Sequence, residues 1–183
     1  MLVAITGATG AYLGIKLLET LRDLDIEVEL IISENAKRII SIETDYKISD
    51  IQNLATKYYD VDDLQAAPAS GSYKGNQNMV IVPCSMKSLS AIANGYASNL
   101  ITRAADVMLK EKRKLTLVVR ESPLNAIHLE NMLKLAKLGV VILPPVPSYY
   151  IRPKSVEELI NFTVGRILDQ FGIDTNIKRW GDP

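Results

Sequence analysis

The chain alternates short apolar runs with amphipathic helical segments. The first apolar run, Leu2 to Ile5, is wholly apolar, as expected for a strand buried on both faces of a parallel sheet. Leucines then recur three and four residues apart between Tyr12 and Leu24, the spacing of a helix packed on one side. The alternation predicts an α/β fold: a three-layer, doubly wound, Rossmann-like parallel sheet with helices on both faces.

The pattern continues along the chain. Further strands are predicted at 26–32, 79–83, 115–119 and 140–143. Further helices are predicted from 33 onward, at 50–57, 85–95, 99–113 and 125–138, and from 155 onward. Glycine, proline and small polar residues predict a long loop at 67–78. Because no repeat or linker interrupts the pattern, we expect residues 1–183 to form a single domain.

Composition excludes several classes of protein. Lys and Arg number 21, and Asp and Glu also number 21, so the chain lacks the basic surplus of a nucleic-acid-binding protein. With one Cys and one His, it cannot form an internal disulfide or a Cys/His zinc site by itself, and no metal is predicted. The first apolar run ends too soon for a secretion signal, and none approaches the ~18 residues that span a bilayer. We expect a cytoplasmic protein without a membrane partner.

Polar and glycine residues follow the predicted strands where each strand ends. They are at 6–10, 33, 83–88 and 120–123. In doubly wound sheets, ligands bind beyond the carboxyl ends of the strands. These segments therefore predict one ligand site at that edge.

The turn from Gly7 to Gly10 (GATG) favours a phosphate-bearing ligand, although a tight turn without a ligand remains open. The next glycine is Gly14, which does not give the dinucleotide spacing. Tyr150 begins a Y-x-x-x-K pattern typical of short-chain dehydrogenases, but Pro153 interrupts it. Ser33 follows the second strand where a dinucleotide site would have a carboxylate. A mononucleotide fits better than a dinucleotide.

Two further segments carry chemistry. The residues from Ser85 to Ser88 place two hydroxyls and a cation at a helix start, which suits a planar ring or an anion, although helix capping by Ser85 alone is equally compatible. Cys84 is interpreted as a small buried residue and not a nucleophile. Arg120 and Glu121 end a strand, where Arg suits a phosphate and Glu can move a proton, unless the two form a surface ion pair.

His128 and Arg166 are two further candidate functional residues. His128 lies one position away from the apolar face of its helix and is interpreted as structural. Arg166 lies between apolar neighbours in the last helix, and a partly buried Arg requires an anionic partner.

Together these motifs resemble the UbiX-type flavin prenyltransferases, which belong to the flavin-containing Cys decarboxylase fold group. The resemblance covers nearly the whole chain and rests on the following segments: TGATGA, Ser33, PASGSY, PCSMKSLSAIANG, AADVMLKE, VVRESPLNAIHLENMLKL, GVVILPPVPSYY and VGRILD. The PCSM and RESPL segments are the most specific.

The resemblance implies transfer of a dimethylallyl group from dimethylallyl monophosphate to reduced FMN. Bonds form to flavin N5 and C6, without a metal ion. The product, prenylated FMN, is the cofactor of a separate UbiD-type decarboxylase. The family also implies a homo-oligomer, a dodecamer built of trimers.

The resemblance also implies roles for individual residues. FMN would contact Gly7, Ala8, Thr9, Ser33, Ser85, Met86, Lys87, Ser88 and Arg120. Dimethylallyl monophosphate would contact Lys110, Arg120, Glu121, Tyr150 and Arg166. Glu121, Ser85 and Thr9 would act in catalysis, although the family usually has serine at Thr9. Arg103 would extend the basic lining, from a neighbouring subunit.

Two alternatives remain. An FMN-dependent cysteine decarboxylase shares the topology, but it uses an early catalytic His and a P-x-M-N-x-x-M-W motif that this chain lacks. A non-catalytic FMN-binding accessory protein would not need the cationic residues Lys110, Arg120 and Arg166.

Overall fold

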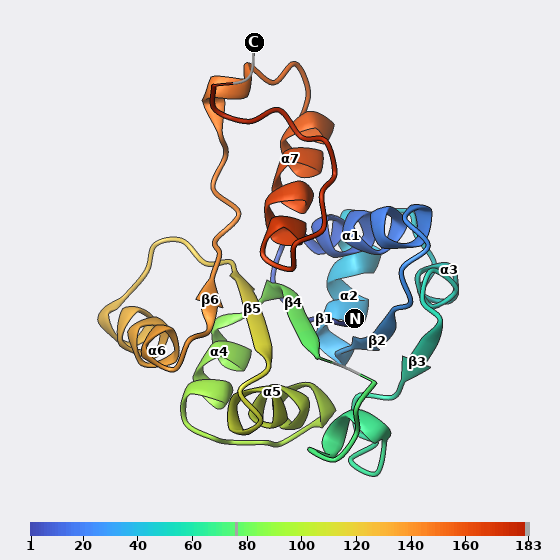
Figure 1. Ribbon diagram of the computed structural model, residues 1–183, viewed down its shortest axis with the longest axis vertical. Helices are drawn as coiled ribbons and strands as arrows, with labels where there is room; N and C mark the ends of the chain where they lie inside the picture. The colour runs from blue at the N-terminus through green and yellow to red at the C-terminus, as the bar shows by residue number, and fades with distance from the viewer. Residues whose placement is uncertain (76, 182–183) are drawn as a thin grey trace.

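The computed structural model describes residues 1–75 and 77–181. Residue 76 of the predicted loop and residues 182–183 of the predicted domain lie outside the described residues. The described chain contains one parallel sheet with the strand order β3-β2-β1-β4-β5-β6 (Figure 1). The strands are β1 (Leu2–Ile5), β2 (Glu29–Ile32), β3 (Lys57–Tyr59), β4 (Asn78–Cys84), β5 (Lys114–Val119) and β6 (Val141–Ile142).

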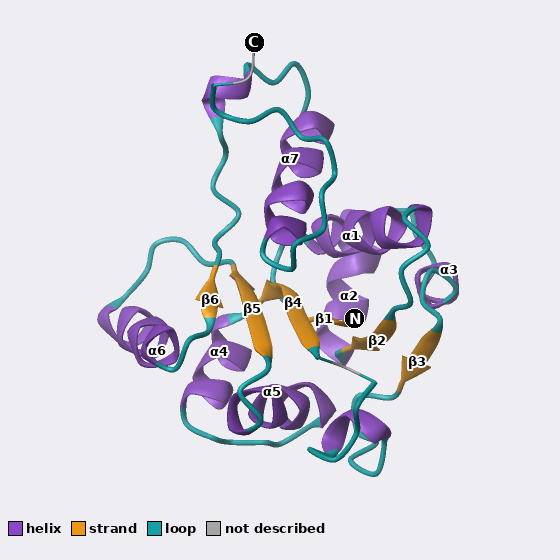
Figure 2. Ribbon diagram, viewed as in Figure 1, coloured by secondary structure: helices purple, strands orange, loops and turns teal. Residues whose placement is uncertain are grey.

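Helices cover both faces of this sheet, as Figure 2 shows. The helices are α1 (Ala11–Asp23), α2 (Glu34–Glu43), α3 (Ile48–Gln52), α4 (Met86–Ala93), α5 (Leu100–Lys110), α6 (Ala126–Lys137) and α7 (Val156–Asp169). Two short 3-10 turns, η1 (Ala67–Ala69) and η2 (Tyr149–Ile151), lie in the connections. The predicted three-layer, doubly wound α/β fold is confirmed.

The core consists of two layers because successive side chains of a strand point to opposite faces. Leu2 and Ala4 of β1 pack with buried residues of α4 and α5, whereas Val3 and Ile5 pack with those of α1, α2 and α7. All four residues are fully buried. A continuous apolar run is therefore required in β1.

Short-range signals set the helix starts. Ser33, Ser85 and Ser155 accept hydrogen bonds from Ala36 N, Ser88 N and Glu158 N, respectively. Each of these serines is therefore the N-cap of its helix.

The segment around Lys57 differs from the prediction. Helix α3 ends at Gln52, and Lys57 starts the edge strand β3, which pairs with β2 from Glu29 onward. The sheet therefore has six strands and not five. β3 is three residues long and only Tyr59 in it is buried, so its sequence lacks the apolar run of a central strand.

Several other bounds are shorter than predicted. β2 begins at Glu29, α5 ends at Lys110, and β6 comprises only Val141–Ile142. The strand order determines where the ligand site lies. The chain places β2 and β3 on one side of β1, and β4, β5 and β6 on the other side. The direction of winding reverses between β1 and β4, where ligands bind in sheets of this type.

Candidate functional site

A cavity of about 400 Å³ opens at this reversal point. It is lined by residues that follow β1, β2, β4 and β5, and by the start of α5. The predicted site residues among its lining are Gly7, Ser33, Ser85, Met86, Lys87, Ser88 and Glu121. The structure thus brings together residues that are far apart in the sequence, as the carboxyl-edge argument predicted.

Thr6 lines this cavity and connects two of its strands by hydrogen bonds. It was not among the predicted ligand residues. Its hydroxyl donates to Pro83 O at 2.8 Å and accepts from Ser85 N at 2.8 Å. The side chain is almost fully buried, at 2% exposure. The ends of β1 and β4 are thereby joined through one hydroxyl. The only local signal for this role is a polar residue at the end of an apolar strand.

The first turn of α4 faces the cavity with free donors. The Ser85 hydroxyl satisfies Ser88 N and lies 3.2 Å from the Ser88 hydroxyl. Within the described residues, the N–H groups of Met86 and Lys87 have no hydrogen-bond acceptor. Unsatisfied N–H groups at a helix start attract anions, and the Lys87 ammonium adds a full positive charge. This turn can hold a phosphate.

At the start of α1, a carboxylate of the same chain accepts the hydrogen bonds of two N–H groups. Glu43 Oε2 accepts from Gly10 N at 2.9 Å and from Ala11 N at 3.0 Å, and Ala8 N donates to Thr6 O. These three N–H groups of the predicted phosphate turn are therefore bonded within the chain. Glu43 was missed because it lies at the far end of α2 and carries no motif.

Gly7 has a packing reason to be glycine. A Cβ at this position would lie 2.5 Å from Asn35 Cβ, at the start of α2. The close approach of the turn to α2 excludes any side chain here.

A second, mostly apolar cavity of about 280 Å³ lies beside Thr9 and Arg120. Gly10, Pro83, prolines 145 and 147, and residues of α1 and α7 line the rest of it. Arg120 lines this cavity and the next residue, Glu121, lines the first, so the end of β5 borders both cavities, which have no lining residue in common. No ion pair joins Arg120 to Glu121 in the described part of the chain, which removes the surface-pair interpretation.

Tyr150 and Arg166 line a third cavity of about 430 Å³, together with Phe162 and Trp180. The structure therefore brings these two predicted substrate residues together, but in a cavity that shares no lining residue with the first.

Lys110 lies apart from all the other predicted residues. Ile101, near the start of α5, lines the first cavity, whereas Lys110 ends that helix and pairs with Glu111 at 2.6 Å. At 1.5 Å per residue, Lys110 is about 14 Å further along the helix axis. Arg103, on the same helix, donates to Ala69 O and pairs with Asp106. Lys110 therefore lies outside the cavity that Glu121 lines.

Two remaining candidates have structural surroundings. Cys84 is fully buried, and burial raises the pKa of its thiol to about 12. His128 N donates to Asn125 Oδ1, and Asn125 N donates to His128 Nδ1, which makes a capping box at the start of α6. These surroundings support the interpretation of both residues as structural.

Metal-ligand clusters and membrane-spanning helices are both absent from the described residues. No group of three or more His, Cys, Asp or Glu is placed to hold a metal ion there. No helix in that part of the chain is long and apolar enough to cross a membrane.

Comparisons with known proteins agree with this geometry. The family model described as Flavoprotein matches residues 1–168. Flavin prenyltransferase UbiX of Methanocaldococcus jannaschii is 54% identical over 182 residues, covering 99% of this chain and 98% of the relative.

Solved structures give the same result. A crystal structure of AnUbiX (PadA1) with FMN and dimethylallyl pyrophosphate superposes with a TM-score of 0.97 at 50% identity, covering 100% of this chain and 97% of the other. The dodecameric FMN-dependent Ubix-like decarboxylase of Escherichia coli O157:H7 gives 0.95 at 45% identity, with 100% of each chain covered. Peptidyl-cysteine decarboxylase EpiD, at 18% identity and 0.61 over 80% of this chain and 81% of the other, shares only the fold. The chain therefore belongs to the Flavoprotein family and, within it, to the UbiX-type flavin prenyltransferases.

Proposed function

We propose that this protein transfers the dimethylallyl group of dimethylallyl monophosphate to reduced FMN, at N5 and C6, to form prenylated FMN. The observation that carries the proposal is that the end of β5 borders two unlike cavities, through Glu121 and Arg120. One cavity has the free donors of α4, and the other is apolar and bordered by Arg120. A flavin mononucleotide and a short hydrocarbon chain need this pair of environments side by side.

The FMN phosphate is assigned to the first turn of α4. Met86 and Lys87 offer N–H groups without acceptors, whereas Glu43 already occupies the start of α1. The full proposed FMN set is Gly7, Ala8, Thr9, Ser33, Ser85, Met86, Lys87, Ser88 and Arg120. Ser85 and Thr9 are the hydroxyls that we assign to catalysis together with Glu121.

The chemistry requires charge neutralisation and one proton acceptor. The C–O bond of the prenyl phosphate breaks and the phosphate leaves with the electron pair, while flavin N5 bonds to the prenyl carbon and loses its proton. The second bond forms when the prenyl double bond takes up a proton, C6 attacks the resulting cation, and the C6 proton departs. Arg120 supplies positive charge for the phosphate, and either the Glu121 carboxylate or the departing phosphate accepts the proton. Both side chains are exposed at the sheet edge, where a substrate can reach them.

The substrate phosphate site draws on more than one copy of the chain. Lys110 and Glu121 belong to the proposed phosphate set, but Lys110 lies outside the cavity that Glu121 lines, so we assign Lys110 to a neighbouring copy. Helix α6 and its C-cap expose three large apolar side chains, because Ile127, Leu133 and Leu138 are 66%, 55% and 63% exposed, and we assign them to contacts between copies. The dodecamer of the Escherichia coli relative is the assembly that we propose here.

Three further assignments accompany this function. Residues 1–183 act as one flavoprotein-like domain, since a single sheet carries both core layers. The reaction takes place in the cytoplasm, where a reducing environment keeps reduced flavin available. Prenylated FMN passes to a UbiD-type decarboxylase.

The decisive experiment is anaerobic incubation of the purified protein with reduced FMN and dimethylallyl monophosphate, followed by mass analysis of the released flavin. The expected result is a mass gain of one C5 prenyl unit. FMN that binds tightly but is never alkylated would contradict prenyl transfer and would favour an accessory flavoprotein.

A further inference from the structure

The chain folds back on itself after α7. Residues 173–181, here called the tail, run beside α7 in the direction opposite to the helix (Figure 1). Gly165 of α7 leaves room for this segment, because a Cβ there would overlap the side chains of Ile177 and Thr175. The helix and the tail are therefore shaped to pack together.

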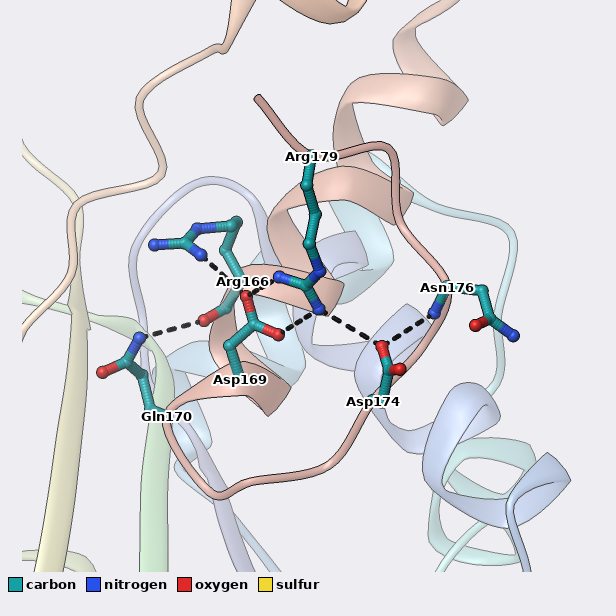
Figure 3. Close-up of polar contacts among 6 residues, drawn as sticks. All are labelled: Arg166, Asp169, Gln170, Asp174, Asn176 and Arg179. Atoms are coloured by element: carbon teal, nitrogen blue, oxygen red, sulfur yellow. Dashed lines mark hydrogen bonds and ion pairs between the residues drawn. The ribbon is translucent and has the colours of Figure 1, made fainter. Parts of the chain in front are cut away.

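Asp169, in the last turn of α7, is the centre of this contact (Figure 3). Arg179 of the tail donates from Nη2 to Oδ1 at 2.8 Å and from Nη1 to Oδ2 at 2.9 Å. Arg166 of α7 donates to the same Oδ2 at 2.7 Å. The Asp169 side chain is only 15% exposed. One sheltered carboxylate thus holds two guanidinium groups, one from each segment.

Because Arg166 and Arg179 share the Asp169 carboxylate, Asp169 neutralises only part of the Arg166 charge. Arg179 occupies both oxygens of Asp169 in the two-pronged geometry that carboxylates bind most strongly. Asp174 binds Arg179 as well, at 3.2 Å. Without Arg179, the whole charge of Asp169 would fall to Arg166. With Arg179 in place, the half-exposed Arg166 guanidinium keeps charge and donors for another anion.

The same contact also places the next residue of the tail. The Trp180 ring meets Tyr150 edge-on, with centroids 5.2 Å apart, and Tyr150 meets Phe162 in the same way at 5.8 Å. These rings and Arg166 line the third cavity. Arg179 therefore fixes the tail in the position at which Trp180 lines the third cavity beside Arg166.

We propose that Arg179 is a positioning residue for the substrate: by binding Asp169, it docks the tail and leaves Arg166 available to the phosphate of a short prenyl monophosphate. The proposal rests on the proposed function and on the assignment of Tyr150 and Arg166 to that substrate, which the family resemblance implies. Arg179 itself is not assigned a contact with the reacting atoms.

The test uses Trp180, the only tryptophan in the chain, as a reporter on the tail. Fluorescence anisotropy of Trp180, the apparent Kd for dimethylallyl monophosphate in single-turnover prenyl transfer, and the Kd for FMN are measured in the assembled protein. The variants are Arg179→Met, Arg179→Lys and Gly165→Ala, the last of which displaces the tail without changing a charge. The matched control is Lys16→Met, which removes an ion pair between Glu157 of α7 and α1 but leaves the tail contacts intact.

Arg179→Met is expected to lower the anisotropy and to raise the Kd for dimethylallyl monophosphate about tenfold, the order of one charge-assisted contact. FMN affinity and the rate at saturating substrate should stay within about twofold, since a positioning residue acts on one subsite. Arg179→Lys should restore part of the affinity, Gly165→Ala should follow Arg179→Met, and Lys16→Met should match the wild type.

Two results would overturn the proposal. In the first, the tail becomes mobile in Arg179→Met or Gly165→Ala while substrate affinity stays unchanged. In the second, FMN affinity falls as much as substrate affinity, which indicates a general structural role. Failure of the proposed function is distinguishable, because the wild type would then add no C5 unit to FMN at all.

Discussion

The Thr6 hydroxyl receives a hydrogen bond from Ser85 N across 79 residues of sequence, at 2.8 Å. The same hydroxyl donates a hydrogen bond to Pro83 O. Together the two hydrogen bonds hold the turn that leads from β4 into α4. Because α4 offers its free N–H groups from this turn, the geometry of the proposed phosphate site depends on one buried side chain that lines the same cavity.

Thr6→Val should therefore weaken both the fold and the flavin site. Valine keeps the shape but leaves Ser85 N without its acceptor, while Pro83 O keeps only its bond from the backbone N–H of residue 6. We expect a cost of about 1–3 kcal/mol in the free energy of unfolding. Denaturant titration and FMN binding measure the two effects, with Thr6→Ser as the control that retains the hydroxyl. If Thr6→Val bound FMN as tightly as Thr6→Ser, the bridge would have no part in the site.

Glu121→Gln should leave FMN bound and slow prenyl transfer. The amide keeps the size of the side chain but cannot accept a proton at neutral pH, and general-base contributions are typically on the order of 10²–10⁴-fold. Single-turnover rates measure the effect, and Glu27→Gln, an exposed change at the opposite edge of the sheet, is the matched control. Unchanged rates would leave proton removal to the departing phosphate.

Arg166→Ala should weaken dimethylallyl monophosphate binding more than FMN binding. The substitution removes the guanidinium from the third cavity, whereas the α4 turn that is assigned to FMN lies in the first. Titrating each ligand separately gives the two affinities. Equal losses for both ligands would contradict the assignment of separate sites.

Tail docking should depend on pH through Asp169. The Arg179 guanidinium, with Arg166, holds the pKa of Asp169 below its ordinary value, which is about 3.9. A carboxyl group whose pKa is lower in the folded state stabilises that state above its unfolded pKa, and the stabilisation is lost as pH falls through the folded pKa. Trp180 anisotropy should stay constant from neutral pH down to about 4 and fall below that, while Arg179→Met should show no such step.

Cys84 should resist alkylation in the folded protein. Its side chain is fully buried, and burial raises the pKa of the thiol to about 12, so almost no thiolate exists at pH 8. Iodoacetamide labelling at pH 8 should be complete only after denaturation. Rapid labelling of the native protein would reopen a catalytic role for this thiol.

Short-range patterns were sufficient to predict most of the secondary structure. Ser33, Ser85 and Ser155 act on N–H groups three residues ahead, and such contacts can be inferred from spacing alone. The apolar runs of β1, β4 and β5 are buried on both faces, which a continuous run requires. The edge strand at Lys57 escaped prediction, because its exposed, charged residues carry neither an apolar run nor a strict alternation.

The sequence by itself therefore determined the fold class and the set of polar residues at the carboxyl edge, because periodicity and strand ends are local properties of a chain. Only the tertiary structure decided which of those residues act together. Glu43 reaches Gly10 N across 33 residues and Thr6 reaches Ser85 N across 79, and Lys110 lies at the end of α5 that is away from the cavity lined by Ile101 and Glu121. Contacts of this kind arise when separate elements pack, so they depend on three-dimensional proximity that no spacing rule along the chain encodes.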